Sequence, residues 1–201
     1  MKDEKYIHLT RTFGPLFDEN SEILILGSFP SVKSREVEFF YGHPQNRFWK
    51  VISAIYNCPL PQTIDEKKEF ALKKHIALWD TIDSCDIIGS DDSSIKNAVP
   101  TDINYVLSSA KIKMIFCNGA VSHKLYMKLS YPLTNIEAVK LPSTSPANAA
   151  YSLDKLISHL VRGNIKIYKS SIKILKCGGS YLSFLIWAAF IYIIIYLFHC
   201  F

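Results

Sequence analysis

Short apolar runs and longer amphipathic segments alternate along residues 22–160 of this chain. Continuous apolar runs that end in glycine, proline or charged residues are typical of strands buried on both faces of a sheet. Four runs have this pattern, and we predict β-strands at residues 22–28, 76–80, 113–119 and 136–142.

The longer segments carry the start signals of helices. Thr63 and Glu66 have the spacing of a capping box, and Thr101 stands at a similar start. The pair Ser145-Pro146 resembles an N-cap followed by proline at the first helical position. The predicted helices are residues 47–56, 63–75, 101–110, 120–130 and 143–160.

Strands that alternate with helices predict a three-layer α/β/α fold around a mainly parallel four-stranded sheet. In such a sheet, ligands bind outside the carboxyl ends of the strands. Four loops rich in Ser, Asp, Asn, Gly and Pro are expected there, and they serve either as plain turns or as a binding site. They are GSFPS (27–31), LWDTIDSCD (78–86), CNGAVS (117–122) and LPSTSPAN (141–148).

Composition limits the class of protein. With 49% hydrophobic and 20% charged residues, the chain can bury one sizeable core. The five cysteines are odd in number, and no two have C-x-x-C spacing, so we expect no disulfide framework and no metal site. The charged N-terminus lacks the apolar run of a signal peptide. We therefore expect an intracellular protein, in the cytoplasm or nucleus.

The net charge of +5 comes from one segment of the chain. Residues 1–161 hold 18 of the 23 Lys and Arg and all 18 Asp and Glu, so this part is neutral. The excess lies in the basic segment 162–180. Bulk charge therefore gives no argument for nucleic-acid binding by residues 1–161.

Residues 181–201 are almost entirely apolar and have about the length of a membrane-spanning helix. Two interpretations stay open. The segment is a transmembrane anchor with its cationic flank in the cytoplasm, or it is the product of a reading frame that runs past its proper end. The first would add a membrane as a partner.

Six blocks, in order, resemble one family: LILGSFPSVKS, FYGHPQNRFW, LWDTIDSC, GSDDSSI, FCNG and LPSTSPANAA. They are similar to the hypoxanthine (deoxyinosine) DNA glycosylases, a branch of the uracil-DNA glycosylase superfamily. The resemblance runs from about Glu22 to about His159. It implies that residues 1–161 are a DNA glycosylase domain with a uracil-DNA glycosylase-like fold.

The resemblance also implies an activity. The expected enzyme is a monofunctional glycosylase that flips a deaminated base (hypoxanthine, or also uracil or xanthine) out of DNA. It would hydrolyse the N-glycosidic bond without metal or cofactor and leave an abasic site. Two departures stand out: Phe29 occupies a position where other branches carry Asp or Asn, and the four cysteines of an iron–sulfur branch are lacking.

An extruded base has to be stacked and its edge has to be read. Stacking candidates are Phe29, Tyr41, Phe48 and Trp49, with Phe29 preferred because it lies in the Gly27–Ser28–Phe29–Pro30–Ser31 loop. Core packing is the alternative for each ring. Asp80 ends a predicted strand, and a carboxylate there would accept the ring N–H of hypoxanthine or uracil while repelling the lone pair of adenine. Capping of its own loop is the alternative.

Asn46 matches the catalytic Asn of the resembled P-x-N-R-F-W block, where its carbonyl would position the attacking water. Its alternative role is the N-cap of the helix at 47–56. Ser143 is expected to face the leaving base. Ser143, Thr144 and Ser145, with the start of the helix that follows, would bind DNA phosphate together with Arg47.

The expected partner is therefore DNA that contains deaminated bases, and we expect a monomer. A non-catalytic nucleotide-binding or regulatory α/β module is the alternative function. It would need a phosphate fingerprint such as G-x-G-x-x-G, which the sequence lacks.

Overall fold

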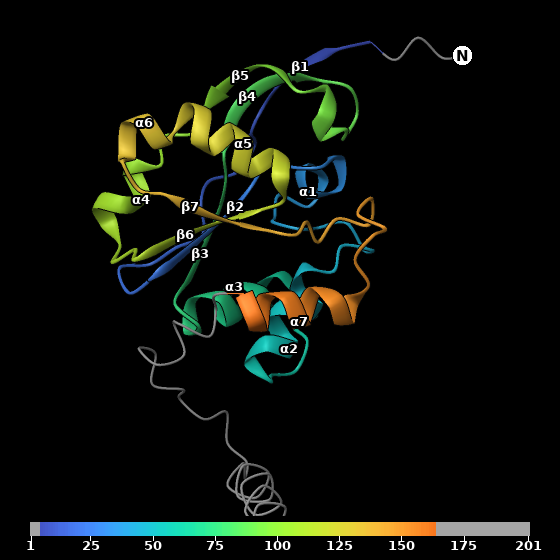
Figure 1. The fold of residues 1–201 in the computed structure, drawn as a ribbon, viewed down its shortest axis with the longest axis vertical. Coiled ribbons are helices and arrows are strands. Elements are labelled where there is room, and N and C mark those ends of the chain that lie inside the picture. The colour runs from blue at the N-terminus through green and yellow to red at the C-terminus, as the bar shows by residue number, and fades with distance from the viewer. Residues whose placement is uncertain (1–4, 164–201) are drawn as a thin grey trace, which may run out of the picture. The chain divides into compact units, whose positions relative to one another are not determined.

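The computed structural model describes residues 5–163 (Figure 1). The predicted tail, 181–201, and all but the first residues of the basic segment lie outside this range. No helix of the described part combines the length and the hydropathy of a transmembrane span. The membrane anchor and the monomeric state stay predictions.

A four-stranded parallel sheet forms the centre, with the order β3-β2-β6-β7. All four predicted strands are confirmed: β2 is Ile23–Gly27, β3 is Ile76–Asp80, β6 is Met114–Asn118 and β7 is Ala138–Leu141. Every residue of β2 and β3 is buried, which explains their continuous apolar sequence.

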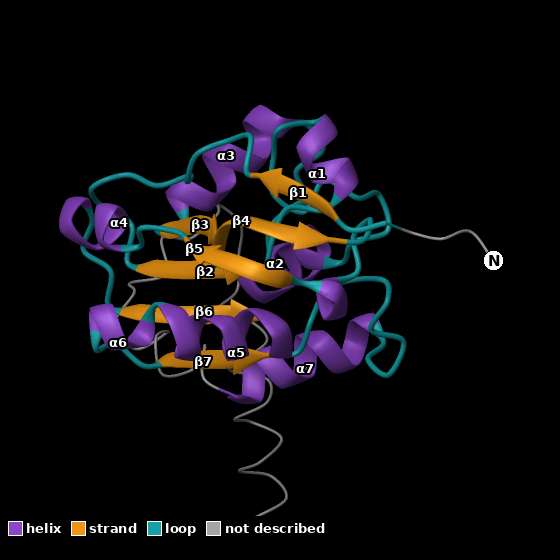
Figure 2. Ribbon diagram, turned by 90° about the horizontal axis from the view of Figure 1, so that it is seen from above, coloured by secondary structure: helices purple, strands orange, loops and turns teal. Residues whose placement is uncertain are grey.

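Helices cover both faces of this sheet and complete the predicted three layers (Figures 1 and 2). One layer holds α5 (Ala120–Leu129) and the short α6 (Tyr131–Thr134). The other holds α2 (Phe48–Tyr56), α3 (Ile64–Lys73) and α7 (Leu153–Gly163). Two further helices, α1 (Val32–Glu36) and α4 (Asn104–Ser109), connect strands.

A second, antiparallel sheet was not predicted. It has the order β1-β4-β5 and consists of Ile7–Thr10, Ile82–Ile87 and Lys96–Pro100, with a 3-10 turn at Asp92–Ser94 before the last strand (Figure 2). The segment 78–86, expected to be a loop after β3, instead continues almost directly into β4. Its polar residues misled the prediction, because Asp83 and Asp86 are only partly buried, whereas Ile82, Cys85 and Ile87 pack with Phe29 in a buried cluster.

The helix starts give a mixed result. The capping box of Thr63 and Glu66 is confirmed. The cap at Thr101 is wrong, because α4 begins at Asn104 and its N-cap, Ile103, makes no side-chain cap bond.

The helix predicted from residue 143 is also wrong in its start, since α7 begins at Leu153 and Ser152 caps it by accepting the Lys155 N–H (3.2 Å). The carbonyls of Thr144, Ser145 and Asn148 accept hydrogen bonds from the Arg47 side chain instead of serving a helix.

Candidate active site

The carboxyl ends of β2, β3 and β6 meet at one edge of the parallel sheet. Gly27 and Asp80 are register partners at the ends of β2 and β3, and β6 ends beside them at Asn118. The Gly27 carbonyl accepts hydrogen bonds from the hydroxyls of Thr81 (2.8 Å) and Ser122 (2.9 Å). These bonds join the loops after three strands, so the segments predicted to form a site lie together.

Gly27 is needed at this edge for space. A Cβ atom on Gly27 would lie 2.4 Å from Asp80 Oδ1, so no other residue fits without displacing that carboxyl group. The Asp80 carboxyl group therefore lies directly against the main chain of Gly27.

Asp80 is a buried acid in an incomplete hydrogen-bond environment. Its side chain is 5% exposed, and Oδ2 has no hydrogen-bond partner among the described residues. Burial raises the pKa of Asp80 to about 7; the Arg11 guanidinium works against this shift and the Asp92 carboxylate adds to it. At neutral pH the Asp80 side chain is therefore divided between its neutral and ionised forms.

A network of amide and hydroxyl groups holds Asn46 beside the end of β6. Asn46 Oδ1 accepts the Phe48 N–H (2.9 Å) and the Thr144 hydroxyl (2.9 Å). The Asn118 side chain donates to Thr144 Oγ1 (2.9 Å) and accepts the Thr144 N–H (3.1 Å). Asn46 thus bonds to the first turn of α2, as the capping alternative expected, and is also fixed from a loop 98 residues away.

The predicted phosphate cradle is changed by this arrangement. Thr144 is 3% exposed and its hydroxyl is engaged by Asn46 and Asn118, so it faces the interior. Ser143 and Ser145 are less buried, and each hydroxyl oxygen accepts a backbone N–H, from Ser145 (3.2 Å) and Ala147 (3.3 Å) respectively. Their hydroxyl protons are left to donate outward, but no helix begins here.

Arg47 holds the loop of residues 144–151 in place. Its guanidinium group donates to the carbonyls of Thr144 (3.3 Å), Ser145 (2.5 Å), Asn148 (3.1 Å) and Tyr151. We predicted that Arg47 would bind DNA phosphate directly. The contacts instead give it a role in positioning the loop that carries Ser143 and Ser145.

The first predicted loop packs partly into the core. Phe29 is 6% exposed and lies in the cluster with Ile82 and Cys85, with the Arg35 guanidinium 5.8 Å from its ring centroid. Ser31 caps α1 by accepting the Ser34 N–H (3.2 Å), and the Pro30 carbonyl accepts a bond from Arg35 (2.6 Å). Core packing, the alternative for Phe29, therefore describes most of its surface.

Tyr41 and Phe48 form a stacked pair at the same edge. Their ring centroids are 3.7 Å apart with an interplanar angle of 17°. Tyr41 has a positive φ of 54°, which is uncommon for a bulky residue and tends to be retained at functional sites. Its hydroxyl is buried near Asp80 and interacts with the Asn118 side chain, but no hydrogen bond of ordinary geometry satisfies it among the described residues.

Three groups of this edge had no predicted role: the Asn118 amide, the Tyr41 hydroxyl and the Asp92 carboxylate. Asn118 and Asp92 lie in the quoted blocks FCNG and GSDDSSI. The sequence shows only that Asn118 ends a predicted strand and that Asp92 is an acid among turn-forming residues. Their partners, however, lie 26 and 64 residues away, so the sequence could not pair them.

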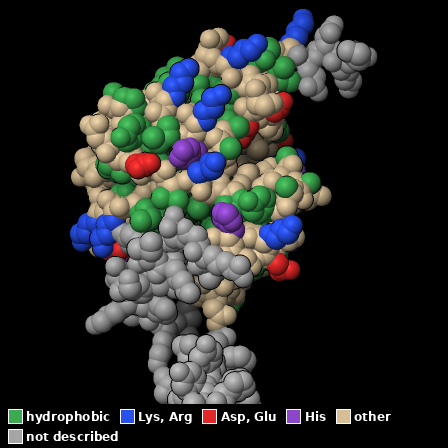
Figure 3. Space-filling view, in the orientation of Figure 1, with side chains coloured by type: hydrophobic (Ala, Val, Ile, Leu, Met, Phe, Trp, Pro, Cys, Tyr) green, Lys and Arg blue, Asp and Glu red, His purple; other side chains and the backbone are tan. Residues whose placement is uncertain are grey.

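Charge is dispersed over the visible surface. Figure 3 shows basic and acidic side chains scattered across one face, without a dense patch of either sign. No group of three or more His, Cys, Asp or Glu residues that could hold a metal ion occurs in the described part of the chain.

Comparisons with known proteins agree with this architecture. The family model described as the uracil DNA glycosylase superfamily matches residues 15–162. A hypoxanthine DNA glycosylase from Methanosarcina acetivorans is 34% identical over 152 residues, which are 73% of this chain and 93% of that protein. One from Methanosarcina barkeri is 35% identical over 112 residues, covering 55% of this chain and 71% of that one.

A solved structure supports the same relationship. The solution NMR structure of a Methanosarcina acetivorans protein assigned to the uracil DNA glycosylases has a TM-score of 0.65 and 29% identity. The match covers 76% of this chain and 94% of that structure. The chain therefore belongs to the uracil DNA glycosylase superfamily and is a DNA glycosylase.

Proposed function

We propose that this enzyme removes hypoxanthine from DNA by hydrolysing the N-glycosidic bond of deoxyinosine, with the attacking water positioned by Asn46. Two relatives that bear the name hypoxanthine DNA glycosylase support the choice of base. The observation that carries the mechanism is the fixed Asn46 side chain, held by the Phe48 N–H and the Thr144 hydroxyl.

In this proposal, water attacks C1′ of the sugar as the bond from C1′ to N9 breaks and its electrons pass to the base. A neutral amide is a weak base, so Asn46 contributes by fixing the direction of attack. Both lone pairs of Oδ1 accept bonds in the free protein. Thr144 is the donor that can yield to the water, because a hydroxyl rotates whereas the Phe48 N–H is fixed in the backbone.

The base would be read by Asp80, whose Oδ2 has no partner among the described residues, and by Tyr41. Hypoxanthine presents a ring N–H beside a carbonyl; a carboxyl group can accept the N–H or, when neutral, donate to the carbonyl, and a tyrosine hydroxyl can donate as well. The Tyr41–Phe48 pair supplies a flat surface for stacking, and Tyr41 is more exposed than Phe29. We accordingly assign stacking to Tyr41, and to Phe29 the support of the loop from Gly27 to Ser31.

DNA would be held by hydroxyl donors rather than by a basic patch. Ser143 and Ser145 have hydroxyl protons left to donate, to the leaving base or to a phosphate. Arg47 acts indirectly, by holding their loop. Because few phosphates are neutralised, binding should depend only weakly on salt.

Strand cleavage after excision tests the proposal. The full chain is incubated with oligonucleotides that contain deoxyinosine, uracil or xanthine, and abasic sites are then cleaved with alkali. We expect cleavage at deoxyinosine and none at adenine. Intact deoxyinosine oligonucleotides would reject hypoxanthine as the substrate, and intact oligonucleotides of every kind would restore the non-catalytic alternative.

A further inference from the structure

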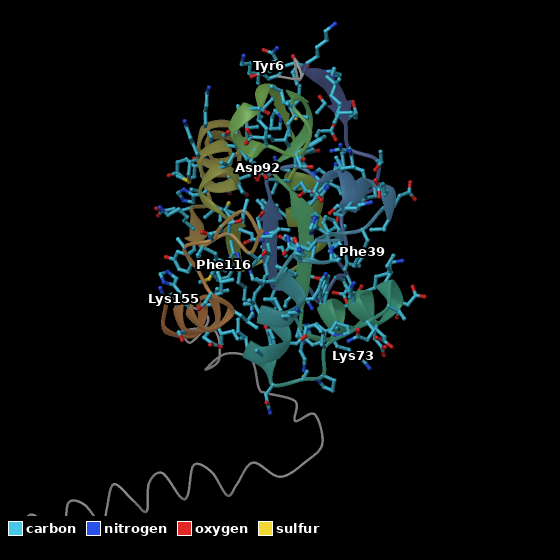
Figure 4. All side chains as sticks on the ribbon, turned by 90° about the vertical axis from the view of Figure 1, so that its right-hand side faces the viewer. Tyr6, Phe39, Lys73, Asp92, Phe116 and Lys155 are labelled. Carbon is cyan, nitrogen blue, oxygen red and sulfur yellow. The ribbon has the colours of Figure 1, made fainter. Side chains whose placement is uncertain are left out.

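Asp92 is a half-buried acid at the site edge that the proposed mechanism does not use. In the view of Figure 4, Asp92 lies between Tyr6 and Phe116. The Ser28 hydroxyl donates to Asp92 Oδ2 over 2.5 Å. A second bond, from the Val32 N–H to the Ser90 hydroxyl (3.0 Å), holds the same loop against the segment that follows Gly27.

Two carboxyl groups therefore lie against consecutive residues. Asp80 contacts Gly27, and Asp92 is bonded to Ser28. A buried acid near a second carboxylate does not ionise readily, because desolvation and repulsion by the other charge both oppose it, and both act on Asp80. The two carboxyl groups differ in their hydrogen bonds. Asp92 accepts a hydrogen bond from the Ser28 hydroxyl, whereas Asp80 Oδ2 has no partner within residues 5–163.

We propose that Asp80 and Asp92 hold one negative charge between them over the Gly27–Ser28 turn, that Asp92 carries it, and that Asp80 meets the base as a neutral hydrogen-bond donor. Asp92 is then a positioning residue that acts through Asp80. The inference rests on the proposed function for the identity of the base, and it adds the protonation state of the site.

The charged groups around the pair agree with this division. Burial raises the pKa of Asp80 to about 7, the Arg11 guanidinium lowers it, and the Asp92 carboxylate raises it. Arg11 is itself bonded to Asp83 (2.9 Å) and to the Phe13 carbonyl (3.0 Å), and of the two charged groups it acts on Asp80 more strongly than Asp92 does.

Asp92 and Tyr41 are the other titratable groups close to Asp80, and their pKa values shift as well. Burial also raises the pKa of Asp92, the Ser28 hydrogen bond lowers it, and Asp91 raises it. Tyr41, the other group close to Asp80, has its pKa raised by burial and stays neutral.

A neutral Asp80 suits the departure of the base. As the glycosidic bond breaks, negative charge develops on the purine, and its carbonyl oxygen becomes a stronger acceptor. A hydrogen bond donated by Asp80 strengthens in that transition state, whereas an ionised Asp80 would repel the charge. A neutral Asp80 no longer repels the ring-nitrogen lone pair of adenine. The selectivity against adenine should therefore fall as the pH is lowered.

The pH dependence of excision tests the pair. Single-turnover excision from a deoxyinosine oligonucleotide is measured between about pH 5 and 9 for the full-length wild type, Asp92→Asn and Asp91→Asn. The wild-type rate should fall above about pH 7. Asp92→Asn keeps an acceptor for Ser28 but loses the charge, so its midpoint should move at least half a unit lower. Asp91→Asn, an exposed neighbour bonded to Ser93, should keep the wild-type midpoint.

Asp80→Asn supplies the second arm. An amide cannot ionise, so its profile should lack the wild-type inflection whatever its absolute rate. Overlapping profiles for wild type and Asp92→Asn, or an unchanged inflection in Asp80→Asn, would overturn the proposal.

A measurement without substrate separates this inference from the proposed function. The Asp80 carboxyl carbon is titrated by 13C NMR in the wild type and in Asp92→Asn. A midpoint near neutrality that moves lower in the variant supports the pair, and an unmoved midpoint refutes it. If the wild type releases no hypoxanthine, the proposed function fails alone, and the titration still decides the charge division.

Discussion

The polar groups in the two halves of the site edge differ in their hydrogen bonding. On the amide side, Asn46, Asn118 and Thr144 bond to one another and to the backbone of Phe48. On the acid side, Asp80 Oδ2 is buried without a partner among the residues described, and the buried Tyr41 hydroxyl makes no hydrogen bond of ordinary geometry there. Both halves lie at the ends of strands in the same parallel sheet.

The difference separates positioning from recognition. A fully bonded network holds its members in one geometry, which suits a residue that must direct a water molecule. A buried polar group left without a partner destabilises the folded protein by about 1–3 kcal/mol, and a ligand that supplies the partner recovers that energy. The hydrogen bonds of the amide side therefore form before the substrate binds, whereas those of the acid side form when the substrate binds.

Removal of the central group of the amide side should have the largest effect. Asn46→Ala is expected to lower the single-turnover rate on deoxyinosine on the order of a hundredfold or more, since one preorganised contact is lost. It should also lower the free energy of unfolding by about 1 kcal/mol, because Asn46 bonds to the first turn of α2. Quench-flow or manual-quench kinetics and urea unfolding measure the two effects.

Asn46→Asp controls for the capping contribution, because an Asp oxygen can still accept the Phe48 N–H and the Thr144 hydroxyl. Its stability should stay close to that of the wild type. A well-folded Asn46→Ala enzyme with nearly the wild-type rate would remove Asn46 from the mechanism.

On the acid side, stability should depend on pH. The pKa of Asp80 rises from 3.8 to about 7 on folding, so its neutral form is favoured in the native state and folding becomes less favourable as the pH rises through this range. Asp80→Asn should therefore raise the free energy of unfolding by about 4 kcal/mol at pH 8 relative to its effect at pH 4. Urea unfolding at both pH values measures the difference. Equal effects at the two pH values would contradict the burial of an unpaired acid.

A smaller change within the network separates Asn46 from its support. Thr144→Val keeps the shape of the side chain but removes the bonds to Asn46 and Asn118, so the rate should fall roughly tenfold and stability by about 1–2 kcal/mol. Thr101→Val is the matched control, since Thr101 is also buried (4% exposed) but its hydroxyl has no partner in the described part of the chain. Equal rates for the two variants would show that Asn46 needs no support from Thr144.

The smallest expected effect concerns the hydroxyls of the loop. Ser145→Ala should weaken binding to DNA about threefold and reduce the salt dependence slightly, since one phosphate contact is lost. Fluorescence anisotropy at several salt concentrations measures this. Ser108→Ala, an exposed serine on α4, is the control. A salt slope typical of many phosphate contacts would mean that the DNA surface lies elsewhere.

Much of the fold could be predicted because its signals are local. The four central strands are continuous apolar runs, and the capping box at Thr63 and Glu66 is a spacing within one turn. The second sheet escaped prediction because β4 is interrupted by the partly buried Asp83 and Asp86, which made it resemble a polar loop. Asp80 was singled out because it stands where a strand ends, and Asn46 because it matches the catalytic Asn of the resembled family's block.

What the sequence by itself determined is the order of strands and helices, the blocks that mark the family, and the position of Asp80 and Asn46 at element ends. Only the tertiary structure decided what these groups contact. Arg47 and Ser145-Pro146 illustrate the difference: the local pattern predicts a helix from residue 145, yet Arg47, 98 residues away, binds the carbonyl of Ser145 and holds the segment as a loop. A local pattern records the preference of each segment alone, whereas the pairing of Ser28 with Asp92, or of Asn46 with Thr144, depends on which strand ends the folded sheet brings together.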